Sequence, residues 1–173
     1  MSVYRTKTYI AADWDHDYDA VSQILDWNDD DYYSSFNFVN VHDFVQAKDD
    51  SLYCTIKRSL SKRMSMCKTF ILIVGEHTNS ITKGGCQNCR NYIKFFDLCT
   101  KGHSISTKSY IDYECESAIN NNLDILVLYN SNRVQKELCP EIIRDVGVHI
   151  PMKKDGAYLF AMVRNGLKKT EGQ

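Results

Sequence analysis

Short apolar runs alternate along the chain with stretches in which apolar residues recur every three to four positions. The strongest run, Thr69–Val74, has five consecutive apolar residues and stops at Gly75. A strand without a polar side is buried on both faces, as in a parallel sheet covered by helices. Weaker runs of the same kind predict four more strands, at residues 8–12, 36–41, 123–129 and 148–150.

Between these strands the apolar spacing is that of amphipathic helices. Leu52, Ile56, Leu60 and Met64 recur every four residues, and lysines and arginines lie mainly between them. This pattern predicts a helix that begins near Asp49–Ser51, because these residue types are good N-caps. Further helices are predicted at residues 21–27, 110–121, 134–138 and 157–167.

Strands that alternate with helices predict right-handed crossovers and a parallel sheet. We expect a single α/β domain over residues 1–173, with a flavodoxin-like, three-layer architecture. Five mainly parallel strands form its sheet, helices cover both faces, a long insertion loop spans about 76–108, and a frayed tail spans about 168–173. Ligands bind such sheets beyond the carboxyl ends of the strands, where the strand order reverses. The loops at Asp13–His16 and from Glu76 onward should therefore border the site.

Composition narrows the class of protein. The chain is 43% hydrophobic and 25% charged, which is typical of a globular domain. Its 21 basic and 22 acidic residues leave a charge of −1, without the basic excess of a nucleic-acid binder. No signal peptide or membrane-spanning run is visible, and seven cysteines without an export signal indicate reduced thiols. We therefore expect a cytoplasmic protein that binds neither nucleic acid nor membrane.

The segment that opens the helix after the long loop carries the candidate chemistry. Ser109 and Asp112 have the spacing of a capping box, and Tyr110 and Glu114 are four residues apart on a neighbouring face. A carboxylate beside an aromatic ring can bind ribose hydroxyls and stabilise an oxocarbenium-like transition state. The alternative is an exposed glutamate without a role. The core-facing stripe of this helix is predicted at Ile111, Cys115, Ala118 and Ile119.

Cysteines in the long loop suggest a second kind of site. Cys86, Cys89, Cys99 and His103 have the spacing C-x2-C-x9-C-x3-H, and a tetrahedral zinc ion would brace a loop that lacks a core. The nine-residue gap is short for a zinc finger, and burial of the loop's apolar side chains is an alternative anchor. Those side chains are Tyr92, Ile93, Phe95, Phe96 and Leu98. We therefore expect no cofactor, keep zinc as an alternative, and disfavour a disulfide. The other cysteines are expected in the core: Cys54, Cys67, Cys115 and Cys139.

Taken in order, these segments resemble the TIR-like domain family that includes the Thoeris antiphage TIR proteins. The resemblance covers about residues 5–150 and is carried by Thr8–Asp13, His42–Asp43, Thr69–Gly75 and Ser109–Tyr129. Enzymes of this family place a catalytic glutamate on the third helix, commonly four residues after a tryptophan. The resemblance assigns the glutamate's position to Glu114 and the tryptophan's to Tyr110, where the chain departs from the family pattern.

The resemblance implies an enzyme that cleaves the nicotinamide–ribose bond of NAD and releases an ADP-ribose-derived messenger, cyclised or joined to an amino acid. The messenger would activate a separate effector protein in antiphage defence. Loops after the first two strands line the NAD pocket in this family, so Asp13, Trp14 and Asp43 are candidate substrate-binding residues. Alternatively, the two aspartates are turn residues and the tryptophan holds a loop in place. The expected partners are NAD, the effector and further copies of this chain.

Two other functions fit the same sequence. Many TIR domains act only as scaffolds that pair with one another, and the tyrosine at position 110 keeps that alternative open. A nucleoside deoxyribosyltransferase-like enzyme shares the ribosyl-transfer chemistry and a similar fold. A receiver domain fits poorly, because Gly75 and Glu76 follow the third strand where a receiver has an aspartate. The sequence also has no P-loop and no glycine-rich dinucleotide motif.

Overall fold

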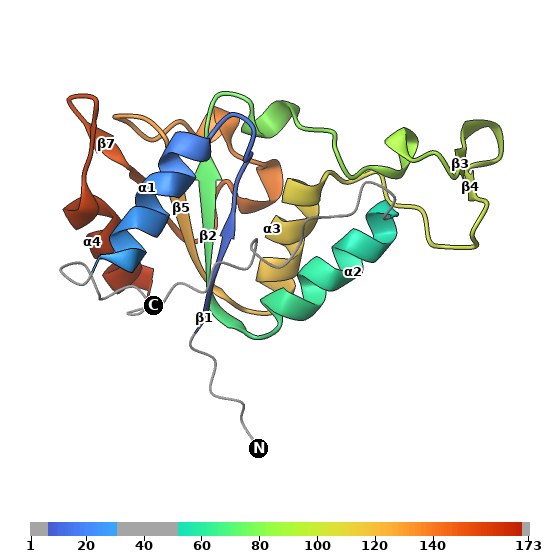
Figure 1. Ribbon diagram of the computed structural model, residues 1–173, viewed down its shortest axis with the longest axis horizontal. Coiled ribbons are helices and arrows are strands. Elements are labelled where there is room, and N and C mark those ends of the chain that lie inside the picture. Colours follow the sequence, from blue (N-terminus) through green and yellow to red (C-terminus); the bar gives the residue numbers. More distant parts are fainter. Residues whose placement is uncertain (1–6, 31–51, 171–173) are drawn as a thin grey trace, which may run out of the picture.

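A parallel sheet of four strands forms the centre of the part of the chain that the computed structural model describes, residues 7–30 and 52–170 (Figure 1). The strands lie in the order β1–β2–β5–β6, and every neighbouring pair is parallel. Their bounds are β1 Lys7–Ala11, β2 Cys67–Val74, β5 Asp124–Tyr129 and β6 Val148–Pro151. The apolar run that predicted a strand buried on both faces is β2, whose residues from Phe70 to Val74 are all buried.

Two helices cover each face of this sheet, as Figure 1 shows. Their bounds are α1 Tyr18–Asp29 and α4 Phe160–Thr170 on one face, and α2 Tyr53–Met64 and α3 Tyr110–Asn120 on the other. Strand residues alternate between the two cores: Ile71 and Ile73 face α1 and α4, and Phe70 and Leu72 face α2 and α3. The predicted three-layer α/β architecture with a parallel sheet is therefore confirmed.

The predicted number of strands needs correction. The sheet of the described residues has four strands rather than five, and the strand predicted at residues 36–41 lies outside the described residues. The N-cap predicted at Asp49–Ser51 lies outside them too, and α2 begins at Tyr53 after Leu52. Within the described part, β1 is an edge strand that pairs only with β2.

The carboxyl-terminal third differs from the prediction in two places. The helix predicted at residues 134–138 is one short 3-10 turn, η6 (Lys136–Leu138), and a second turn follows at η7 (Glu141–Ile143). The last helix begins later than predicted because the preceding residues form a hairpin, β7 (Lys153–Lys154) with β8 (Ala157–Tyr158).

The tail predicted to be frayed from residue 168 is helical as far as Thr170. The Thr170 side chain is buried, and its hydroxyl donates to the carbonyl of Leu167 at 2.7 Å. A buried, hydrogen-bonded last turn does not fray, so the prediction was wrong for residues 168–170.

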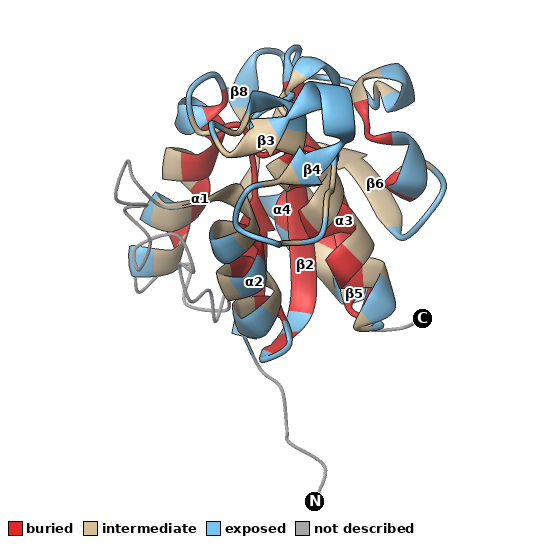
Figure 2. Cartoon of the chain, turned by 90° about the vertical axis from the view of Figure 1, so that its right-hand side faces the viewer, coloured by how far each residue is buried: buried red, intermediate tan, exposed pale blue. Residues whose placement is uncertain are grey.

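The insertion after β2 has short elements of its own. They are η3 (Thr78–Ser80), η4 (Cys86–Asn88), β3 (Tyr92–Ile93), η5 (Lys94–Phe96) and β4 (Leu98–Cys99), and β3 and β4 form an antiparallel hairpin. The alternative in which burial of apolar side chains anchors this segment does not hold for Phe95, Phe96 and Leu98, which are 89%, 69% and 52% exposed, while Tyr92 is half-buried (Figure 2). The hairpin projects from the body of the domain, where nothing in the described chain can cover these rings.

The length and apolar character of the helices determine whether any of them could span a membrane. Among the described residues, no helix combines the length and apolar character needed to cross a bilayer.

Candidate active site

The start of α3 is fixed by the capping box that the sequence predicted. The Ser109 hydroxyl oxygen accepts the N–H of Asp112 at 3.1 Å, and the Asp112 carboxylate accepts the N–H of Ser109 at 3.4 Å. These two bonds satisfy helix donors that would otherwise lack partners. With the start fixed, the helical repeat turns Ile111, Cys115 and Ala118 into the core between α3 and the sheet, as predicted.

Glu114 lies on the same inward side of α3 and is only 4% exposed. The Tyr9 hydroxyl, from the middle of β1, donates a hydrogen bond to the Glu114 carboxylate. Tyr9 is itself fully buried and stacks on Phe70 of β2. The exposed-glutamate alternative is therefore wrong, because this carboxyl is buried and accepts a hydrogen bond from a residue of the sheet.

Burial controls the protonation of this pair. It raises the pKa of Glu114 to about 7, although the hydrogen bond from Tyr9 acts in the opposite direction. Burial and the neighbouring Glu114 carboxyl raise the pKa of Tyr9 well above its usual value, so Tyr9 stays a hydrogen-bond donor. A carboxyl that exchanges its proton near neutral pH is suited to acid–base and charge-stabilising work.

Replacing Tyr9 with phenylalanine should destabilise the protein more at pH 8 than at pH 5. The ionised Glu114 carboxylate loses its donor, which costs about 2 kcal/mol for a bond to a charged group, and the neutral carboxyl loses less. Urea unfolding at the two pH values measures the difference. Tyr92→Phe is the matched control, since the Tyr92 hydroxyl also donates to a carboxylate, Asp97, at 2.7 Å, but on the surface. Equal losses at both pH values would contradict the assignment.

Tyr110, one turn before Glu114, is half-buried at the start of α3. Its ring packs edge-on against Tyr53 of α2, with ring centroids 5.8 Å apart. Its hydroxyl is buried and has no hydrogen-bond partner among the described residues. Burial raises the pKa of Tyr110, so the hydroxyl is a neutral donor available to a bound group. Tyr110 and Glu114 thus lie one turn apart on α3, where Tyr110 packs against Tyr53 of α2 and Glu114 accepts from Tyr9 of β1.

Gly84 supports the Tyr110 ring. It has φ of +102°, and a Cβ atom there would lie 2.7 Å from the ring. We expect Gly84→Ala to destabilise the protein by about 3 kcal/mol, from left-handed strain and overpacking together. Gly102→Ala is the control: φ is +71°, no atom lies within 4 Å of its Cβ, and the cost should be about 1 kcal/mol. Equal shifts in melting temperature would contradict the proposed contact.

The candidates after β1 occupy different surroundings. The Asp13 carboxylate accepts the N–H of Asp15 at 3.2 Å and pairs with Nδ1 of His16 at 2.6 Å, so it organises a turn. Trp14 packs against the core between α1 and the sheet, on the face opposite Glu114 and Tyr110. The fifth candidate, Asp43, lies outside the described residues.

The loops after β1 and β2 meet, as expected from the topology. The rings of His16 and His77 are 4.3 Å apart between centroids. Beneath them the buried Asp17 carboxylate accepts from the Asn130 side chain at 3.0 Å, next to Gly75, and burial raises the pKa of Asp17. Only the meeting of the loops after β1 and β2 was predicted from the sequence; the bond between Asp17 and Asn130 adds the loop after β5 and joins residues 113 positions apart.

Residues 9–83 match the family described as Thoeris protein ThsB, TIR-like domain. The match covers less than half of the 173 residues of the chain. The match runs from β1 through β2 into the insertion and ends before α3, so it includes Tyr9 and Asp13 but not Glu114. No curated protein matches the chain. The resemblance expected from the sequence is confirmed over this part of the chain, and the matched family suggests a role in antiphage defence.

An open groove lies beside α2 and α3. Its volume is about 490 Å³, and its lining includes Lys57, Arg58, Lys62 and Tyr113. Lys57 is partly engaged, since its Nζ donates to the carbonyl of Lys108 at 2.6 Å. The groove has the size and charge to receive a phosphate-bearing ligand. Glu114 does not line it, and the carboxyl is covered in this conformation.

Proposed function

We propose that this protein consumes NAD: it cleaves the nicotinamide–ribose bond and makes an ADP-ribose-derived signalling molecule in antiphage defence. The observation that carries the proposal is the buried Glu114 carboxyl, held by the Tyr9 hydroxyl, with a pKa raised to about 7. The match of residues 9–83 to the ThsB TIR-like family supports it. The position of Tyr110 one helical turn away also supports it, because a ring there can stack on a planar base.

In the reaction, the bond between the ribose C1′ and the nicotinamide nitrogen breaks, and its electron pair neutralises the pyridinium ring. The Glu114 carboxylate stabilises the ribosyl cation that develops and hydrogen-bonds the ribose hydroxyls. A nucleophile then bonds to C1′ and releases one proton, which a carboxylate with a pKa near 7 is able to accept. Water gives ADP-ribose, an atom of the same molecule gives a cyclic product, and an amino acid gives a conjugate.

Substrate binding on this proposal involves Tyr110 beside the reacting ribose, with Asp13, Trp14 and Asp43 as further candidates. The covered state of Glu114 fits an enzyme that is weak at rest, because NAD reaches the carboxyl only after covering groups move. The protein would act in the cytoplasm, without a cofactor in the chemical step. Its product would activate a separate effector, and copies of the chain would associate.

Incubation of the intact protein with NAD, followed by mass spectrometry of the small molecules, tests this function. We expect nicotinamide together with an ADP-ribose-derived product, and more of both when extract from phage-infected cells is added. NAD left intact in both conditions, with self-association of the protein, would favour the scaffold alternative. Exchange of bases between deoxynucleosides without loss of NAD would favour the deoxyribosyltransferase alternative.

A further inference from the structure

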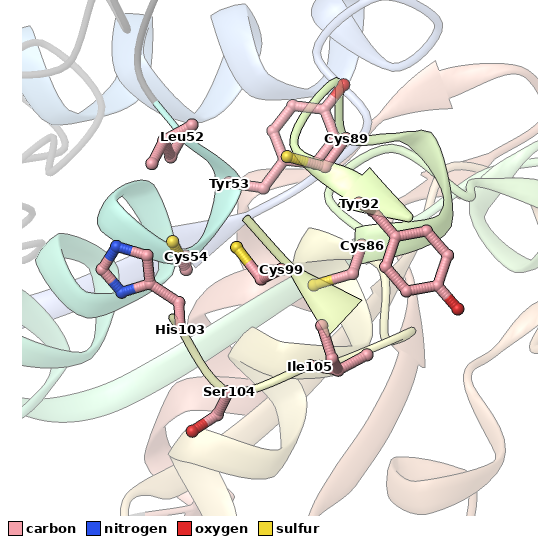
Figure 3. A pocket seen from close by; sticks show the side chains of 10 residues that line it. All are labelled: Leu52, Tyr53, Cys54, Cys86, Cys89, Tyr92, Cys99, His103, Ser104 and Ile105. Carbon is pink, nitrogen blue, oxygen red and sulfur yellow. The ribbon is translucent and has the colours of Figure 1, made fainter. Parts of the chain in front are cut away.

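Five metal-ligating side chains line a single small pocket beside the insertion. Figure 3 shows Cys54, Cys86, Cys89, Cys99 and His103 around it, and we call these five residues and the space between them the thiol pocket. Cys54 comes from the first turn of α2. The other four come from the insertion, at η4, the residue after it, β4 and the loop beyond. Three separate stretches of chain thus bring soft donors to one place.

The thiol pocket is too small for an organic ligand. Its volume is about 10 Å³, whereas the groove beside α2 and α3 has a volume of about 490 Å³. That volume holds about one water molecule or one ion. The pocket therefore has the size of a site for a single atom, and its donors are thiols and an imidazole.

The tip of the insertion, residues 92–99, has no buried apolar side chain. Ile93, Phe95, Phe96 and Leu98 are exposed, and Tyr92 is half-buried. Burial therefore contributes little to its stability, and the hairpin of β3 and β4 has only two residues in each strand. An isolated hairpin of this size is not stable in water, so another interaction must brace the segment.

The chemistry and backbone around the thiol pocket suit zinc. The turn at η4 closes with the N–H of Cys89 donating to the carbonyl of Cys86 at 2.9 Å, which keeps the two thiols of the C-x2-C pair together. The N–H of Ser106 donates to the sulfur of Cys86 at 3.2 Å, a bond of the kind that stabilises a metal-bound thiolate. Three sulfurs and one imidazole nitrogen form a common tetrahedral zinc set.

We propose that Cys86, Cys89, Cys99 and His103 bind one structural zinc ion that braces the insertion. As the side chains stand, no group of three or more His, Cys, Asp or Glu side chains in residues 7–30 and 52–170 is arranged to hold a metal ion. Binding therefore includes side-chain rotation, and a change of χ1 rotamer moves a cysteine sulfur by about 3 Å. The metal draws the donors together, as in small domains that become ordered when they take up zinc.

The braced segment runs directly into the candidate active site. The N–H of Tyr110 donates to the carbonyl of Lys83 at 2.9 Å, and Lys57 of α2 holds the carbonyl of Lys108. Both ends of the insertion are thus tied to the beginning of α3 and its neighbour. Zinc would stabilise the position of Tyr110 whether or not the protein cleaves NAD, so this inference is independent of the proposed function.

The test is the metal content of the intact protein, produced with zinc in the medium and passed through gel filtration. We expect about one zinc per chain by plasma mass spectrometry. We also expect cobalt-substituted protein to show sulfur-to-cobalt charge transfer and tetrahedral visible bands. Cys99→Ser and His103→Ala should each lower retained zinc at least tenfold. Cys54→Ser is the matched control, a thiol of the same pocket that should keep its zinc.

Several results would overturn the proposal. The first is a wild-type protein that contains no zinc and shows no cobalt bands. The second is a disulfide between two of the three loop cysteines, detected by thiol counting. The third is loss of zinc from Cys54→Ser but not from His103→Ala. Should the cysteine variants fail to fold, chelator treatment of the wild-type protein replaces them. Proteolysis within residues 83–108 should then accelerate at least tenfold, and zinc but not magnesium should reverse it. An unchanged rate would contradict the bracing role.

Discussion

Replacement of Glu114 by glutamine should lower the rate of NAD cleavage at least a hundredfold. The glutamine keeps the size of the side chain and can still accept the hydrogen bond from Tyr9, but it carries no negative charge at any pH. Removal of one group that stabilises developing charge in a dry site typically costs factors of about 100 to 1,000. The measurement is the initial rate of nicotinamide release, which follows the bond that breaks.

Glu116→Gln is the matched control for this experiment. Glu116 lies on the same helix two residues further on, but its carboxylate is partly exposed and pairs with Lys108 at 2.5 Å. A solvated ion pair of this kind contributes little, so this variant should retain the wild-type rate within about a factor of three. A wild-type rate in Glu114→Gln would remove that carboxyl from the mechanism. Equal losses in both variants would indicate damage to α3 instead.

The same Glu114→Gln change should stabilise the protein at alkaline pH relative to the wild type. The pKa of Glu114 is raised to about 7 in the folded state, from an ordinary value of 4.5 in the unfolded chain. Between these values the folded state holds more protons, so the free energy of unfolding falls as the pH rises. Its stabilising contribution is complete below pH 4.5 and is lost by about pH 7. The difference of 2.5 units corresponds to at most about 3 kcal/mol.

Urea unfolding of both proteins from pH 4.5 to pH 8 measures this effect. Other groups titrate over the same range, so the quantity to follow is the difference between the two proteins. It should move in favour of Glu114→Gln by up to about 3 kcal/mol as the pH rises and level off above about pH 7. A difference that does not change with pH would mean that Glu114 titrates alike in the folded and unfolded states.

Local patterns predicted most of the fold correctly. The unbroken apolar run gave β2 because a buried central strand needs no polar face, and the spacing of Ser109 and Asp112 gave the start of α3 because a capping box acts within four residues. The helical end at Thr170 was missed because its buried environment comes from the tertiary fold and leaves no signal in a lysine-rich segment.

The candidate site was predicted in part. Glu114 was identified through family resemblance and helical phase, but its burial was not predicted, because a glutamate in an amphipathic helix normally marks the wet side. The partner that explains the burial, Tyr9, lies 105 positions earlier in the chain. Alternation along β1 places Tyr9 on the face toward α3, yet no spacing rule links a strand residue to one position of a distant helix.

In the insertion, residue type alone does not predict which side chains are buried. Burial of Phe95, Phe96 and Leu98 was one of two alternatives for anchoring this loop, because large apolar residues are usually buried, but the structure exposes them on a projecting hairpin. Cys54 was expected in the core and instead lines the thiol pocket. Cys67, Cys115 and Cys139 are buried as predicted. Cys54 differs from them because it lies in the first turn of α2, next to the insertion, where it is only partly buried.

The central claim concerns one carboxyl group that is buried, held by Tyr9 and able to exchange its proton near neutral pH. Titration of the Glu114 side-chain carboxyl carbon by NMR, with Glu114→Gln used to assign the signal, tests it most directly. We predict a midpoint near pH 7, far above that of the exposed glutamates. A midpoint near pH 4.5 would contradict the account, because it would describe a solvated carboxylate.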